Sequence, residues 1–173
     1  MAQPLGESTP DRRILVAGIG NIFLRDDGFG PEVLRRLVSR DLPEGVRAVD
    51  FGIRGVHLAY ELLDGWDGLV LVDAVPNRGA PGTVRAFEVN DSTNIGVGQF
   101  DAHAMDPGAV FASLRALGGE LPPTVVVGCQ VESVDEGIGL SQVVRDSVEI
   151  AVDAVFDVVE RMVAGCVSES PAK

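Results

Sequence analysis

The chain has 173 residues, of which 26 are acidic and 14 are basic, so its formal net charge at pH 7 is -12. This excess of carboxylates argues against binding DNA, RNA or anionic lipid, which are held mainly through Lys and Arg contacts to phosphate. A metal ion or a cationic partner suits an acidic chain better, and acidity that only keeps the protein in solution is the alternative.

The length fits a single domain, since about 100 to 200 residues per domain is usual. Hydrophobic residues make up 46% of the chain and can supply one core. We expect the domain to span residues 12–164, with flexible termini at 1–11 and 165–173.

Two cysteines, Cys129 inside an apolar segment and Cys166 near the end, suggest neither a disulfide framework nor a cysteine zinc site. No apolar run approaches the roughly 18 residues of a membrane span, and no signal segment is recognisable at the start. The cytoplasm is therefore the expected location.

Apolar runs alternate with helical patterns along the chain. Helices are predicted at 31–40, 57–65 and 106–118, and a long one from the N-cap Ser141 to about Met162. Strands are predicted at 14–19, 46–51, 67–75 and 122–133, and a further one within 77–90 that has no helix before it and should be antiparallel or at an edge. The alternation predicts one three-layer α/β/α domain with a mostly parallel twisted sheet flanked by helices.

The turn after the first strand is the place where chemistry is expected. Gly18 and Gly20 let the backbone leave the strand sharply, and the acids Asp26 and Asp27 follow. Pro31 is predicted as the first residue of the next helix, where its missing N–H needs no partner.

Three acids follow strand ends, Asp27 after the first, Asp50 at the second and Asp73 at the third. Ligands of parallel sheets bind beyond the carboxyl ends of the strands, and His103 lies in a loop that could reach the same rim. Two carboxylates and an imidazole form a ligand set suited to Zn, Ni or Mn. The alternative is that the acids only cap helices or make turns and that His103 is a surface histidine. His57, at a predicted helix start, is a weaker ligand candidate.

A dinucleotide site is the competing interpretation of the first turn. Gly18 and Gly20 supply two glycines of G-x-G-x-x-G, and Asp50 follows at a distance compatible with a ribose-binding acid. However, Phe23 replaces the third glycine, and the adjacent acids would repel a pyrophosphate. Nucleophilic catalysis is not indicated either, because there is no G-x-S-x-G elbow and Cys129 reads as a core residue.

The segments GIGNIFLRDDGFGPEV, LVLVDAV, APGTV and VVGCQVES, with one histidine at position 103, resemble the hydrogenase maturation endopeptidases. The resemblance runs from Arg12 to about Met162. It implies an α/β/α fold and removal of a C-terminal extension from the large subunit precursor of a nickel-iron hydrogenase after nickel has been inserted. The metal-contacting positions of the family correspond to Asp27, Asp73 and His103.

Many members carry Asp-Gly-Gly-Thr after the second strand, whereas residues 50–55 here are Asp-Phe-Gly-Ile-Arg-Gly. This departure leaves the hydrogenase subtype open, because the loop should face the substrate. Arg54 could bind a substrate carboxylate or form a salt bridge with Asp50.

Two mechanisms follow from the resemblance, with Asp27, Asp50 and Asp73 as the catalytic candidates. Nickel carried by the substrate and held by Asp27, Asp73 and His103 could polarise a carbonyl or a water. Alternatively, Asp27 or Asp50 could act as general base in an aspartic-type reaction, with the metal used only for recognition. A non-catalytic metal-binding maturation chaperone and a nucleotide-binding enzyme are the other function classes.

Overall fold

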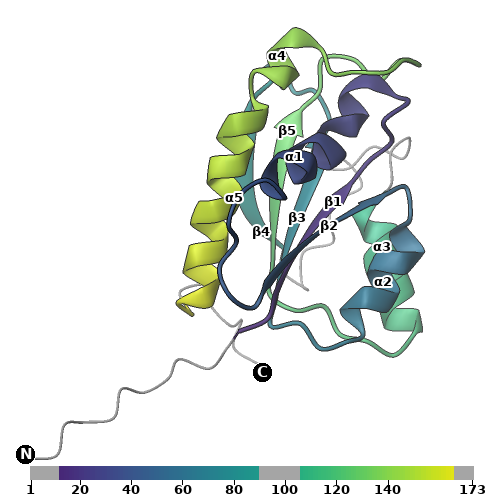
Figure 1. The fold of residues 1–173 in the computed structure, drawn as a ribbon. Helices are drawn as coiled ribbons and strands as arrows, with labels where there is room; N and C mark the ends of the chain where they lie inside the picture. Colours follow the sequence, from purple (N-terminus) through teal and green to yellow (C-terminus); the bar gives the residue numbers. More distant parts are fainter. Residues whose placement is uncertain (1–11, 90–105, 166–173) are drawn as a thin grey trace, which may run out of the picture.

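The computed structural model describes residues 12–89 and 106–165 (Figure 1). In chain order its elements are β1 (Ile14–Ile19), the 3-10 helix η1 (Arg25–Gly28), α1 (Phe29–Leu37), β2 (Val46–Gly52), α2 (Gly55–Leu62), β3 (Gly68–Val75), β4 (Val84–Val89), α3 (Pro107–Ala116), β5 (Thr124–Gln130), α4 (Gln142–Arg145) and α5 (Val148–Val163). The expected flexible termini lie outside the described residues apart from Gly165. No helix within the described ranges has the length and apolarity needed to cross a membrane.

Five strands form one sheet in the order β2-β1-β3-β5-β4. The first four are parallel, and β4 pairs antiparallel with β5 at the edge, which confirms the prediction for the strand without a preceding helix. The chain moves from β1 to one side to form β2 and then to the other side to form β3. Ligand sites of such sheets lie at this reversal, between the carboxyl ends of β1 and β3.

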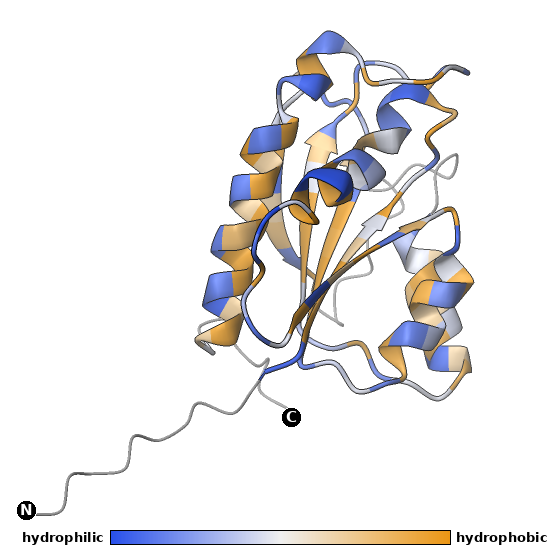
Figure 2. Cartoon of the chain, in the orientation of Figure 1, coloured by the Kyte–Doolittle hydropathy of each residue, from blue (hydrophilic) through white to orange (hydrophobic). Residues whose placement is uncertain are grey.

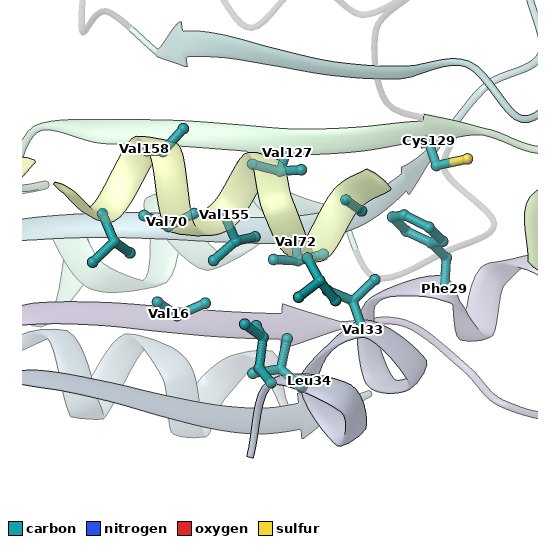
Figure 3. Packing of buried hydrophobic residues seen from close by; sticks show 14 of the residues in the cluster. Val16, Phe29, Val33, Leu34, Val70, Val72, Val127, Cys129, Val155 and Val158 are labelled. Atoms are coloured by element: carbon teal, nitrogen blue, oxygen red, sulfur yellow. The ribbon is translucent and has the colours of Figure 1, made fainter. Parts of the chain in front are cut away.

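Helices cover both faces of the sheet, so the predicted α/β/α layering is confirmed. On one face α1 and α5 pack on Val16, Val70 and Val127, as Figure 3 shows. On the other face α2 and α3 pack on Leu15 and Leu71. Alternate residues of each strand therefore enter different cores, and the central strands are apolar along their length (Figure 2).

The first helix begins earlier than predicted. It starts at Phe29 rather than at Pro31, because η1 runs directly into it, and the proline stands third. A proline is tolerated in this first turn since its missing N–H would have no partner within the helix. The helix ends at Leu37 instead of residue 40.

The long helix predicted from Ser141 to Met162 is wrong in one respect, because it is divided into α4 and α5. Ser147 stands between the two, and its hydroxyl donates to the carbonyl oxygens of Gly82 at 2.6 Å and Val143 at 2.9 Å. This side chain thus ties the helix start to the loop before β4.

Candidate functional site

The turn after β1 is held close to the sheet by glycines. Gly20 has φ +140°, and a Cβ there would lie 1.9 Å from the main-chain oxygen of Asp27. A Cβ on Gly30 would lie 2.2 Å from the oxygen of Ile19 and 2.6 Å from that of Val72. Only glycine fits these two positions, and their contacts fix where Asp27 lies relative to β1 and β3.

Asp27 and Asp73 are the buried acids at the reversal between β1 and β3, with 1% and 2% of their surfaces exposed. Asp27 Oδ2 accepts a hydrogen bond from the backbone N–H of Asn21 at 2.7 Å. The other oxygen, Asp27 Oδ1, and Asp73 Oδ1 are buried and accept no hydrogen bond from the described residues. A buried carboxylate oxygen without a donor is costly, so it indicates a position where a ligand is expected to bind.

Both carboxyl groups are harder to ionise than usual. Burial raises the pKa of Asp73 well above its ordinary value, and the charges of Asp27 and Asp106 raise it further. Burial also raises the pKa of Asp27, against the hydrogen bond from Asn21. Both shifts favour the protonated forms, most strongly for Asp73, and the charge of a bound cation would act in the opposite direction.

Asp26 is fully buried like its neighbour but serves a different purpose. Its Oδ2 accepts from the backbone N–H groups of Glu132 at 2.8 Å and Ser133 at 3.0 Å, and from the Ser141 hydroxyl at 2.9 Å. Its Oδ1 accepts from the Ser141 N–H at 2.6 Å. These hydrogen bonds hold the acidic turn against the loop after β5, and, unlike Asp27, Asp26 has no unpartnered oxygen to offer a metal.

Asp106 is a site residue that the sequence patterns did not identify. It is the N-cap of α3, where its side chain accepts from the N–H of Gly108 at 2.8 Å, and its charge acts on Asp73. The sequence contains a signal for its N-cap position, because an Asp directly before a proline, here Pro107, is typical of a helix start.

Asp50 lies at the same rim but on the far side of β1 from Asp73, since β2 and β3 flank β1. It is exposed, and its Oδ1 accepts from the N–H of Gly52 at 2.8 Å. The salt bridge considered between Asp50 and Arg54 is not formed. Instead, the Arg54 guanidinium donates to the carbonyl oxygens of Phe51 at 3.1 Å and Asp50 at 2.8 Å.

The predicted metal-ligand set is present only in part within the described residues. Asp27 and Asp73 are brought together, His103 lies outside the described residues, and no group of three potential ligands occurs in 12–89 and 106–165. The two unpartnered oxygens fit a hard or borderline divalent cation, which prefers oxygen or mixed oxygen and nitrogen ligands. His57 is exposed on α2.

Cys129 is a core residue, as the sequence predicted. It is buried in the cluster beneath α1 and α5, and burial raises the pKa of its thiol to about 12. A thiol that stays protonated is a poor nucleophile, so cysteine chemistry is not supported.

The comparisons with known proteins agree on one family. Residues 31–158 match the family model described as hydrogenase maturation protease. The hydrogenase 2 maturation protease of Escherichia coli is 31% identical over 83% of this chain and 88% of its own. The coenzyme F420 hydrogenase subunit delta of Methanothermobacter thermautotrophicus is 33% identical over 85% and 94%.

The fold leads to the same family. The structure of the hydrogenase maturating endopeptidase HybD from Escherichia coli superposes with a TM-score of 0.70 and 28% identity, covering 86% of this chain and 93% of that chain. These matches do not favour the nucleotide-binding interpretation of the first turn. The chain belongs to the hydrogenase maturation protease family and is a peptidase.

Proposed function

We propose that this protein removes the C-terminal extension from the large subunit precursor of a nickel-iron hydrogenase after nickel has been inserted. The observation that carries the proposal is the pair of buried carboxylate oxygens, on Asp27 and Asp73, that accept no hydrogen bond from the described residues. Membership of the maturation protease family supports the reaction, and the acid pair supports its dependence on a metal ion in the substrate.

In this proposal the nickel arrives as part of the precursor. Asp27 and Asp73 each offer one oxygen to it, and His103 is the proposed third contact. Binding the cation would offset the cost of ionising two buried carboxyl groups close together. Because an unloaded precursor would lack that gain, cleavage becomes conditional on nickel insertion.

In the alternative mechanism, in which the metal is used only for recognition and Asp27 does not bind it, Asp27 is the better candidate for the general base than Asp50. It is buried beside the proposed metal position, and its raised pKa brings it nearer to the pH at which it would accept a proton from water. Asp50 is exposed and lies across β1. In the mechanism in which Asp27 and Asp73 hold the nickel, the metal would instead act as a Lewis acid towards the scissile carbonyl.

The partner in this proposal is one hydrogenase large subunit precursor. The exclusion of nucleic acid and membrane partners rests on the acidic composition and the apolar pattern, and the cytoplasmic location expected from the sequence stays a prediction.

The proposal is tested by the intact mass of the cognate precursor after incubation with the wild-type protein, with and without nickel loading. Loss of a C-terminal peptide from the loaded precursor alone is expected. Unchanged mass of a precursor that is confirmed to be loaded and bound would contradict the proposal and favour the maturation chaperone. Cleavage of both forms would contradict only the metal dependence.

A further inference from the structure

A groove of about 720 Å³ reaches the turn that carries Asp27, although neither Asp27 nor Asp73 is among its lining residues. Its walls come from the turn before α1, the exposed side of α1, and the loop that leads into α4. Gly28, which follows Asp27 directly, is part of the lining, and so is Asp50. A chain bound in this groove would therefore run to the turn that carries Asp27.

The groove is cationic although the whole chain has a net charge of -12. Its lining includes four arginines and only two acids: Arg25, Arg35, Arg36, Arg145, Glu32 and Asp50. Arg35 and Arg36 are paired with Glu32, and Arg36 also with Glu149. These ion pairs leave the other two arginines as the available positive charges.

Arg25 and Arg145 form no ion pair within the part of the chain that the structure describes. An Nη atom of Arg145 donates to the carbonyl oxygen of Leu140 at 3.0 Å, which positions the side chain and leaves its charge uncompensated. The Arg25 side chain lies against Gly137, where a Cβ would be 3.2 Å from its Nε atom. Both arginines are exposed and can meet an anionic ligand.

The same groove presents large apolar side chains to water. Ile138 is 76% exposed and Ile22 is 49% exposed, and both line it. Clustered exposed apolar residues beside arginines are characteristic of protein docking surfaces. A small inorganic anion would use the arginines but leave the isoleucines uncovered, so the surface fits a peptide better.

We propose that this groove binds the C-terminal extension of the hydrogenase precursor, as a peptide whose carboxylates meet Arg25 and Arg145 and whose apolar side chains cover Ile22 and Ile138. The inference rests on the proposed function and adds the position of the leaving peptide. A precursor that continues from the groove past Gly28 would bring the bond to be cut towards Asp27. The acidic remainder of the surface would repel the same carboxylates and so favour this orientation.

The test compares the double variant Arg25→Gln/Arg145→Gln with the matched control Arg85→Gln/Arg161→Gln. The control removes the same charge from exposed positions on β4 and α5 that are absent from the groove lining. Dissociation constants for the nickel-loaded precursor are measured by titration calorimetry, and KM and kcat by intact mass. Circular dichroism verifies that both variants are folded.

The groove variant should weaken precursor binding and raise KM by about tenfold, the size expected from two exposed charge contacts, with little change in kcat. The control should match the wild type, and a precursor with its extension carboxylates changed to amides should bind both variants alike. Equal binding by the groove variant and the wild type would overturn the inference, as would equal weakening by the control. If the wild type binds the precursor without cutting it, the proposed function is wrong. The comparison of dissociation constants still shows whether the extension binds in the groove.

Discussion

Two adjacent acids in this protein have different environments and therefore different roles. Asp26 accepts four hydrogen bonds from the loop after β5, whereas Asp27 and Asp73 each keep one buried oxygen that accepts none from the residues the structure describes. Hydrogen-bond satisfaction, not burial, separates them, since all three are buried. In the described part of the chain, these two unsatisfied oxygens lower the stability of the protein when no ligand is bound.

Asp73→Asn should stabilise the metal-free protein at pH 8. Because the folded pKa of Asp73 is raised, the folded state holds this proton more firmly than the unfolded state, and stability falls as pH rises above the ordinary Asp value of about 3.9. Asparagine does not ionise, so the variant does not lose stability in this way as the pH rises. We expect a melting temperature higher by about 2–4 °C at pH 8, equivalent to about 1 kcal/mol, and a difference that disappears near pH 4.

Thermal unfolding in EDTA between pH 4 and pH 8 measures this effect. Asp157→Asn, which changes an exposed carboxyl on α5, is the control and should show no such trend. A lower melting temperature for Asp73→Asn at pH 8 would show that its carboxylate is satisfied by a group outside the described residues.

Asp26→Asn should have the opposite effect on stability. The amide keeps only one acceptor oxygen, so in either orientation its NH2 group faces backbone N–H donors: that of Ser141 in one, those of Glu132 and Ser133 in the other. Hydrogen bonds are lost there, and repulsion between donors replaces them. We expect a loss of about 2–4 kcal/mol in the free energy of unfolding, measured in urea, together with reduced cleavage. Asp135→Asn alters an exposed carboxyl of the same loop and should lower the free energy of unfolding much less. Equal losses in the two variants would contradict the stabilising role of the Asp26 hydrogen bonds.

At the scale of elements, the close approach of α1 to the sheet positions the site. Gly30→Ala would place a methyl group within 2.6 Å of the main-chain oxygens of Ile19 and Val72, which are backbone atoms that cannot rotate away. The start of α1, and with it the turn that carries Asp27, must shift. We expect a loss of about 1–3 kcal/mol and a larger fall in cleavage than in stability.

Gly119→Ala is the matched control for that change. A Cβ at Gly119 would meet the side chains of Leu114 and Leu63, which can adopt other rotamers far from the acids. It should therefore leave cleavage unchanged. Comparable loss of cleavage in both variants would contradict the positional role of the contact between α1 and the sheet.

The elements that the sequence predicted well are those with a strong local pattern. The apolar runs of β1, β3 and β5 indicate buried parallel strands. The strand that has no helix before it is the antiparallel β4. The division into α4 and α5 was missed because its cause is not local. Ser147 bonds to Gly82, which is 65 residues earlier in the chain.

At the scale of the whole molecule, the topology explains why sequence reasoning identified part of the site. Carboxyl ends of parallel strands meet at one rim, so acids after β1 and β3 were expected to converge, and Asp27 and Asp73 do. Which member of the Asp26 and Asp27 pair faces the site could not be predicted, because the partners of Asp26 lie more than 100 residues away. The role of His103 stays a prediction.

The central claim is that Asp27 and Asp73 carry out the processing reaction, and the rate of peptide release from the nickel-loaded precursor tests it most directly. Asp27→Asn and Asp73→Asn should each lower the rate by about 100-fold or more while remaining folded, and Asp157→Asn should match the wild type. If both site variants stay within about tenfold of the wild type, the buried acid pair is not the catalytic site.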